Sequence, residues 1–578
     1  MITRLTLAAA VLASIAAGPV GAQARYRPAA GYRSSAELAR ALDSLQRARS
    51  DLIRVSEIAR SPGGRPVSLI RLGAGRDVDE RPAVLLVANG YGPDLVGSEI
   101  AIRAAATLAA GYGRDTAVTR LLDRVTFYLV PRANPDAAEA LFGTPAVERA
   151  GNDTPADDDR DDATGEDGPD DLDGNGLITM MRIPDPAGEW MTDPLEPALL
   201  RRADRKKGET GRFTLVVEGR DDDGDESYNE DGPGGTDISR NYPHGYAWFA
   251  PTSGAHQLSA DESRAIVDLF RERTNIAALY VIGQHDNLLQ PWEFKRVPGI
   301  SGNPQGTSAG GPFTTALPED EPWYAEMSRR FKRVTGWSDP PPATPFGGDL
   351  ASFGYFGLGR LAFAARGWWI PKMAGDTSRS VPKPPSPDPI ATERNAHAWL
   401  AANRPEALIP WRQVSLPSSP RGGPAQQVEV GGFAPGALLN PPPALLDSVA
   451  AKHTAFLAEL GRALPSVALR DVRIESLGSR VFRISALVAN DGFFPTVSAI
   501  GARVRWPRRV KVELVTSGSQ SISAGSATQL LDPIEGSGGS RAVSWVVVGD
   551  PGSTVTLRAG SPVAGTAVET LTLRPRQP

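Results

Sequence analysis

The fold class is decided by the stretch Val84-Leu85-Leu86-Val87-Ala88-Asn89-Gly90-Tyr91-Gly92-Pro93-Asp94-Leu95-Val96-Gly97-Ser98-Glu99. An apolar run of strand length leads into a glycine-rich turn, and a helical stretch follows from Ser98 to Ala110. Similar apolar runs at 125–130 and 276–282 predict further buried strands, with a helical pattern over 260–273 before the second. Strands that alternate with helices favour an α/β domain with a mostly parallel sheet, where sites lie at the carboxyl ends of strands.

Composition limits the possible partners. The chain has 578 residues, enough for two or three domains, and its 41% hydrophobic content is ordinary for a globular protein. A formal net charge of −5 gives no electrostatic reason to expect a nucleic acid. The sequence lacks cysteine, so disulfides and lipid-anchored cysteines are excluded. After the N-terminus, no apolar stretch reaches the about 18 residues that a membrane-spanning helix needs.

The N-terminus has the pattern of a signal peptide. Arg4 precedes an apolar run from Leu5 to Ala17, and the small residues of 18–22 follow it. We therefore predict a signal peptide over 1–22, cleavage near Ala22, and export to the periplasm or the exterior.

The remaining chain divides into three predicted parts. The α/β pattern occupies 30–412, starts with a helix over 34–59, and is interrupted by acidic stretches at about 152–180 and 220–232. Residues 413–466 read as a proline-rich linker followed by a helix. From 467 to 578, apolar strands alternate with Gly/Ser/Asn turns and no helical period is present. This last pattern predicts a β-sandwich domain.

Four segments occur in the order typical of one enzyme family: 88–99, 132–136, 235–243 and 347–368. Together they resemble the zinc carboxypeptidases of the carboxypeptidase A type, in particular large bacterial members with acidic insertions. The resemblance implies a mixed sheet flanked by helices. It also implies a catalytic zinc held by a His-x-x-Glu pair and a later His, with a Glu as general base.

The residues at the family's catalytic positions differ from that pattern. Tyr91 and Asp94 stand where the resemblance implies the zinc-binding His and Glu. The third ligand position falls on Gly283, with His285 two residues later on the same side of an extended strand. Arg366 stands at the general-base position, and a guanidinium cannot accept a proton there. We therefore predict a degenerate zinc site with impaired or lost peptidase chemistry.

The substrate-binding positions are better preserved. Arg240 matches the family arginine that binds the substrate's terminal carboxylate, while Ser239 replaces its Asn partner. Arg182 is the candidate for polarising the scissile carbonyl, and Glu429 is a remote alternative for a relocated base. Such arginines favour an anionic ligand, a peptide or another carboxylate-bearing molecule.

The acidic stretches predict structural calcium sites. The sequence 171–178 has oxygen side chains at alternate positions and Gly at the sixth, like the first half of an EF-hand loop. The same alternate spacing, with poorer glycine placement, occurs at 221–231 and at 157–161. The calcium candidates are Asp171, Asp173, Asn175, Asp221, Asp223 and Asp225. The alternative is a set of solvated acidic loops.

Simpler roles remain open at each position. Tyr91 could be a packed aromatic, Asp94 a helix cap, and Arg240 or Arg366 a partner in an ion pair. The leading interpretation is an exported, carboxypeptidase-like binding protein without effective zinc catalysis. The alternatives are an active metallocarboxypeptidase with a divergent site that includes Asp94 and His285, and a structural envelope or surface protein that attaches through its β-sandwich.

Overall fold

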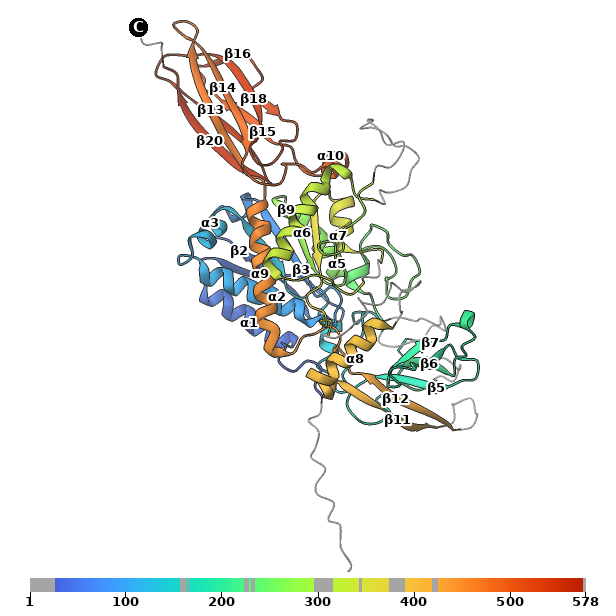
Figure 1. Ribbon diagram of the computed structural model, residues 1–578. Coiled ribbons are helices and arrows are strands. Elements are labelled where there is room, and N and C mark those ends of the chain that lie inside the picture. Colours follow the sequence, from blue (N-terminus) through green and yellow to red (C-terminus); the bar gives the residue numbers. More distant parts are fainter. Residues whose placement is uncertain are drawn as a thin grey trace, which may run out of the picture.

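A six-stranded mixed sheet forms the centre of the computed structural model in Figure 1, and its strand order is β1-β2-β4-β3-β9-β10. Strands β3, β4, β9 and β10 are parallel, and the β1–β2 hairpin adds antiparallel strands at one edge. Every residue of β3 is buried, as expected for a strand covered on both faces. The strand bounds are β1 Ile53–Arg60, β2 Pro66–Leu72, β3 Ala83–Ala88, β4 Thr126–Val130, β9 Ile276–Ile282 and β10 Leu361–Ala365.

The structure describes residues 26–155, 164–165, 167–222, 228–229, 234–295, 315–342, 346–373, 390–417 and 425–574. The predicted signal peptide and the acidic stretch 157–161 lie outside these residues. No helix among the described residues is long and apolar enough to cross a membrane.

Helices flank the central sheet, and α2 packs against α9 and α9 against α6. The first helix ends at Ala48, and not near 59 as the apolar spacing predicted, because the chain turns at Arg49 and enters β1. The helix bounds are α1 Ser35–Ala48, α2 Leu95–Gly111, α3 Thr116–Arg124, α4 Pro135–Ala140, α5 Asp261–Glu272, α6 Glu321–Thr335, α7 Leu350–Ser352, α8 Ala391–Asn403, α9 Leu446–Ala463 and α10 Ala499–Val504.

A second, antiparallel sheet joins two parts of the sequence that are far apart, in the order β11-β12-β5-β8-β6-β7. Its strands are β5 Met180–Pro184, β6 Trp190–Thr192, β7 Leu200–Arg202, β8 Phe213–Val217, β11 Leu408–Leu416 and β12 Gln426–Phe433. The predicted linker over 413–466 therefore differs from the structure. Its first part is a hairpin of this sheet, and α9 belongs to the main core.

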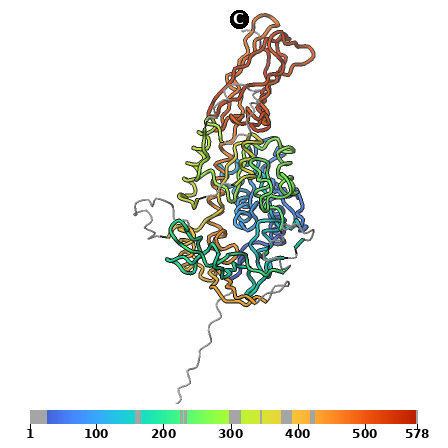
Figure 2. Tube along the Cα trace, turned by 90° about the vertical axis from the view of Figure 1, so that its right-hand side faces the viewer, coloured from blue at the N-terminus to red at the C-terminus, as the bar shows by residue number. Residues whose placement is uncertain are grey.

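The C-terminal part consists of two four-stranded antiparallel sheets around their own apolar core, as the sequence predicted. It stands at one end of the molecule, and the second sheet lies toward the other end (Figures 1 and 2). The strands are β13 Val467–Ser476, β14 Val481–Asn490, β15 Lys511–Val515, β16 Ser521–Ala524, β17 Thr528–Leu530, β18 Gly539–Val548, β19 Thr554–Ser561 and β20 Gly565–Thr572.

Candidate functional site

The loop after β3 carries the first two candidate residues. Asn89 ends the strand with φ 56°, a left-handed conformation that asparagine adopts more readily than most residues. Its Nδ2 donates to the carbonyl oxygens of Tyr91, Gly92 and Asp94 at 3.2, 2.7 and 2.8 Å. Gly92 packs directly on α4, where an added Cβ would lie 2.2 Å from Ala137 Cβ. These contacts fix the loop in one conformation.

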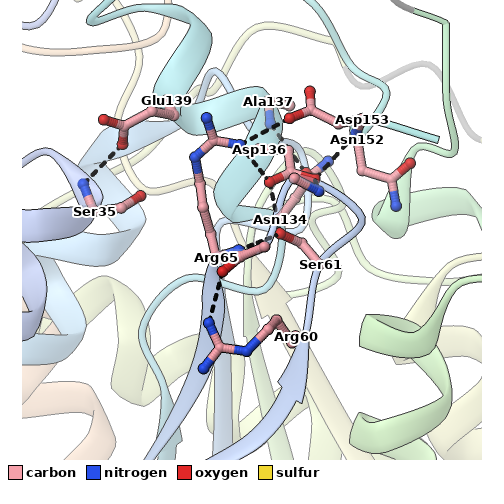
Figure 3. Close-up of polar contacts among 12 residues, drawn as sticks. Ser35, Arg60, Ser61, Arg65, Asn134, Asp136, Ala137, Glu139, Asn152 and Asp153 are labelled. Atoms are coloured by element: carbon pink, nitrogen blue, oxygen red, sulfur yellow. Dashed lines mark hydrogen bonds and ion pairs between the residues drawn. The ribbon is translucent and has the colours of Figure 1, made fainter. Parts of the chain in front are cut away.

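A buried carboxylate holds α4 beside this loop (Figure 3). Asp136 accepts hydrogen bonds from Ser61 Oγ, Gly63 N, Arg65 Nη1 and Asp153 N, at 2.6 to 3.1 Å. These four donors satisfy both carboxylate oxygens. The 132–136 segment therefore supports the site and leaves none of the charge of Asp136 unpaired.

Burial favours the protonated, neutral forms of the Tyr91 and Asp94 side chains. Burial raises the pKa of the Tyr91 phenol above its usual range, and the nearby carboxyls of Glu148 and Asp237 add to the effect. Asp94 is 3% exposed, and burial raises its pKa to about 7. Asp94 occupies the N-cap position of α2 without a side-chain capping bond, and its Oδ1 has no hydrogen-bond partner among the described residues. Its position thus agrees with the capping alternative, and a backbone hydrogen bond from Gly97 opposes the rise of its pKa, although no side-chain capping bond of normal geometry is formed.

Arg366 places a positive charge near the carboxyl groups of Asp286 and Asp94. It directly follows β10, and its Nη2 donates to the carbonyl of Pro342 at 2.9 Å. Burial lowers the pKa of Arg366, while the charges of Asp286 and Asp94 oppose this shift. Asp286 is 5% exposed, accepts from Leu288 N, and has a buried Oδ2 without a partner in the described chain. Asp286 is a residue of this site that the sequence did not single out.

The third expected ligand position is open, and the nearby histidine is engaged elsewhere. An added Cβ at Gly283 would meet no atom within 4 Å. His285 accepts a hydrogen bond at Nε2 from Trp292 Nε1 at 3.1 Å, which assigns the ring proton to Nδ1. Nδ1 lies 3.9 Å from Asp349 Oδ1. The His285 ring also packs edge-on against Phe346 at 6.0 Å between centroids.

Arg240 lies near the same cluster and remains accessible. It ends a short 3-10 turn, Ile238–Arg240, that Asp237 caps by accepting from Ser239 N and Oγ. Its Nε lies 3.5 Å from Asp237 Oδ2, and its guanidinium stacks 4.9 Å from the ring centroid of Phe346. The side chain of Arg240 is 44% exposed.

Burial raises the pKa of Asp237 to about 6, so its pairing with Arg240 weakens in mildly acidic solution. An added Cβ on Gly90 would lie 3.6 Å from Ser239, so this turn abuts the loop after β3.

A cavity of about 560 Å³ adjoins these groups. Its walls combine aromatic rings, two histidines and three carboxylates: His244, Gly245, His285, Asp286, Gln290, Pro291, Trp292, Glu293, Thr315, Ala316, Phe346, Gly347, Asp349, Ser352 and Phe356. The cavity-lining Phe346 also stacks with the Arg240 guanidinium. The cavity-lining Asp286 also interacts electrostatically with Arg366. The loop that supplies His244 continues to Trp248 and Phe249, which are 56% and 93% exposed.

The structure does not bring Arg182 or Glu429 to this cavity. Arg182 lies on β5 of the second sheet, where its Nε donates to Glu429 Oε2 of β12 at 2.8 Å. Its guanidinium also packs on the rings of Phe213 and Trp411, at 5.1 and 4.5 Å. The candidate carbonyl-polarising arginine and the candidate relocated base therefore bind each other, and neither lines the cavity.

The first acidic loop forms a compact carboxylate cluster. Oxygens of Asp171, Asp173 and Glu218 lie within 4.8 Å of one another. Asp171 accepts from Asn175 N and Gly176 N, which gives the loop its predicted turn. Glu218 directly follows β8. The sequence did not predict it as a calcium ligand, because it lies before the second acidic stretch. Asn175 Oδ1 accepts from Leu177 N at 2.7 Å. Asp221 belongs to no such cluster among the described residues, and Asp223 and Asp225 lie outside them.

Two family models match the chain. A model described as zinc carboxypeptidase matches residues 38–172, and one described as domain of unknown function (DUF8731) matches residues 466–572. The first match includes the loop of Tyr91 and Asp94, and the second coincides with the β-sandwich. The second model is described only as a domain of unknown function, so it assigns no function to the β-sandwich.

Relatives among characterised proteins match short segments. Carboxypeptidase E of Caenorhabditis elegans is 29% identical over 121 residues, 20% of this chain and 26% of that protein. Human carboxypeptidase D is 36% identical over 110 residues, 15% of this chain and 8% of that protein. The chain thus spans about a quarter or less of the length of these relatives.

Solved structures with similarity include the carboxypeptidase A from Helicoverpa armigera, at 15% identity and a TM-score of 0.35. That match covers 60% of this chain and 66% of the other. The metallo-carboxypeptidase from Burkholderia cenocepacia is 16% identical with a TM-score of 0.28, covering 58% and 60%. The matched residues 38–172 contain strands β1 to β4 of the mixed sheet and the loop after β3. Over residues 38–172, the chain is similar to the zinc carboxypeptidase family.

Proposed function

We propose that the chain is an exported carboxypeptidase-like protein that binds peptides or other carboxylate-bearing ligands and lacks effective zinc-dependent peptidase chemistry. The observation that carries this proposal is Arg366 beside the buried carboxyls of Asp94 and Asp286. A permanent cation at the general-base position cannot take a proton from water, and it disfavours a dication nearby. The export part rests on the signal-like pattern of residues 1–22.

The donors present do not fit a catalytic zinc. Such a site needs three nitrogen or oxygen ligands that converge on one point. Among the described residues, three such ligand atoms converge at Asp171, Asp173 and Glu218 and not around Asp94 and His285. His285 already uses its Nε2 lone pair, and the Tyr91 phenol resists ionisation. These features favour binding over the alternative of an active metallocarboxypeptidase.

The cavity and Arg240 support a ligand with a free carboxylate. The stacked, half-exposed guanidinium of Arg240 can donate two parallel hydrogen bonds to one carboxylate. The neighbouring cavity of about 560 Å³ can take a side chain of the same ligand. The exposed Trp248 and Phe249 supply apolar contact area for a longer peptide.

A binding measurement with matched peptides tests the proposal. Peptides with a free C-terminus should bind about 10- to 100-fold more tightly than their amides, because a charge-assisted hydrogen bond contributes about 1.5–3 kcal/mol. Arg240→Ala should remove the difference, whereas Arg264→Ala, an exposed change on α5, should preserve it. Equal affinity for acid and amide would contradict the carboxylate clamp. Stoichiometric zinc with peptide hydrolysis would favour the enzyme.

We also propose calcium as a structural ion at Asp171, Asp173 and Glu218. Hard carboxylate oxygens are typical calcium ligands, and three clustered negative charges repel each other without a cation. Asp173 supports the fit: its side chain is 7% exposed, its Oδ2 lacks a hydrogen-bond donor in the described chain, and Arg412 Nη1 is 3.8 Å away. A bound calcium would connect the first acidic loop to the end of β8.

A further inference from the structure

A buried arginine stands at the junction between the α/β part and the β-sandwich. Arg360 is 5% exposed, and its Nε is buried without a hydrogen-bond partner among the residues that the structure describes. Burial lowers the pKa of Arg360 to about 10, and no carboxylate in the described part of the chain opposes the shift. The guanidinium therefore stays protonated at neutral pH. A buried cation without a counter-charge is strongly unfavourable.

Arg360 lines a small cavity between the two domains. The volume is about 20 Å³, enough for about one water-sized species. The walls come from β9, the start of β10, the connection from α9 to β13, and loops of the C-terminal part: Ala277, Gly359, Arg360, Leu361, Pro465, Phe494, Pro495, Thr496, Val497, Ser498, Pro507 and Val563. None of these described wall residues carries a carboxylate. Polyatomic anions such as phosphate are too large for this space, whereas a monatomic anion fits.

The surroundings of the cavity favour an anion over a neutral molecule. Pro507 of the wall belongs to the segment Arg503-Val504-Arg505-Trp506-Pro507-Arg508-Arg509, whose four arginines are all exposed and of which Arg509 pairs with Asp532. Clustered positive charge raises the local concentration of anions. Water could satisfy the Nε–H group, but it would not neutralise the charge of Arg360.

We propose that the cavity at Arg360 binds one halide-sized monovalent anion, chloride in solution, and that this ion stabilises the junction between the two domains. The ion compensates the guanidinium while contacting walls supplied by both domains. Removal of the ion leaves a buried charge at the junction and destabilises the native state relative to the unfolded chain.

Thermal unfolding of the full-length protein at constant ionic strength tests this proposal. With increasing chloride in place of gluconate, the wild-type melting temperature should rise by about 2–4 °C and then saturate. Bromide should act like chloride, and its anomalous scattering in crystals should place it beside Arg360.

Two variants separate site binding from a general salt effect. Arg360→Met removes the charge with a side chain of similar length, so it should fold and lose the saturable chloride response. Arg558→Met, an exposed change on β19, should keep the response. Identical wild-type melting in chloride and gluconate, or an unchanged chloride response in Arg360→Met, would overturn the proposal.

Discussion

Arg366 determines what the carboxyl ends of the central strands can do. A guanidinium is a permanent donor, so it orients carboxylates but cannot act as a base. Its charge interacts with Asp94 and Asp286, and both carboxyl groups are otherwise disfavoured by burial. Arg366 thus supplies a fixed positive charge beside two buried carboxyl groups, which is the feature on which the proposed binding function rests.

Asp94 should make the stability of the protein depend on pH in a diagnostic direction. Its folded pKa of about 7 exceeds the unfolded value of about 3.9. The folded state therefore retains a proton that the unfolded state releases, and stability should fall as pH rises from about 4 to 7. In denaturant unfolding, the unfolding free energy of the wild type should fall by on the order of 1–4 kcal/mol across this window. Asp94→Asn should lack this fall.

The same experiment separates this protonation from metal binding. A zinc-bound Asp94 would be ionised, and its pKa would lie below the unfolded value, so stability would rise with pH. Asp237, with a folded pKa of about 6, contributes in the same direction as Asp94 over a narrower range. Asp94→Asn should retain that smaller slope. An identical pH profile for wild type and Asp94→Asn would contradict the raised pKa.

The positions of several candidate residues relative to the strands were predictable from the sequence, whereas their roles stay predictions. Tyr91, Asp94 and Arg366 sit at carboxyl ends of parallel strands, and these ends meet at one edge of a sheet. The position of Arg182 on the second sheet could not be predicted from a neighbouring strand of the central sheet. Its partner Glu429 is 247 residues away, and no local pattern records such a contact.

At the scale of elements, long apolar runs were predictable and short strands were not. The strands over 83–88, 126–130 and 276–282 lie within about a residue of their predicted bounds. The second sheet was missed because strands such as β6 and β7 have three residues each and lie among proline and acidic residues. Its pairing of β5 with β12 also depends on tertiary contacts that sequence periodicity does not encode.

Calcium should stabilise the element formed by the first acidic loop and β8. Ligand binding adds about 2.7 kcal/mol at a hundredfold excess over Kd, which should appear as a higher melting temperature after calcium is added to chelated protein. Asp171→Asn and Glu218→Gln keep the side-chain shapes and should each lose most of this gain. Asp43→Asn, an exposed change on α1, serves as the control and should respond as wild type does. A melting curve that calcium leaves unchanged would favour solvated acidic loops.

At the scale of the whole molecule, the β-sandwich is attached by specific polar contacts as well as by the chain. Asp320 lies in a 3-10 turn, Pro318–Asp320, just before α6, and it is fully buried. Its oxygens accept from the backbone N–H groups of Ala499 and Ile500 at 2.8 and 3.0 Å, and from Tyr355 Oη at 2.9 Å. Asp320 therefore satisfies the first free donors of α10 from the other domain.

Asp320→Ala should loosen this junction, where Phe494 and Ile500 pack on the α/β core, while the central strands of both parts stay intact. It leaves two backbone N–H groups and one hydroxyl buried without acceptors, at a cost of about 2–4 kcal/mol in unfolding free energy. Hydrogen exchange of residues 494–505 should become faster, while the amides of β3 and β14 remain protected. Asp532→Ala removes an 81%-exposed partner of Arg509 and should change neither quantity. Asp320→Asn, which retains one acceptor, should lie between Asp320→Ala and wild type. Wild-type exchange in Asp320→Ala would show that packing alone holds the domains together.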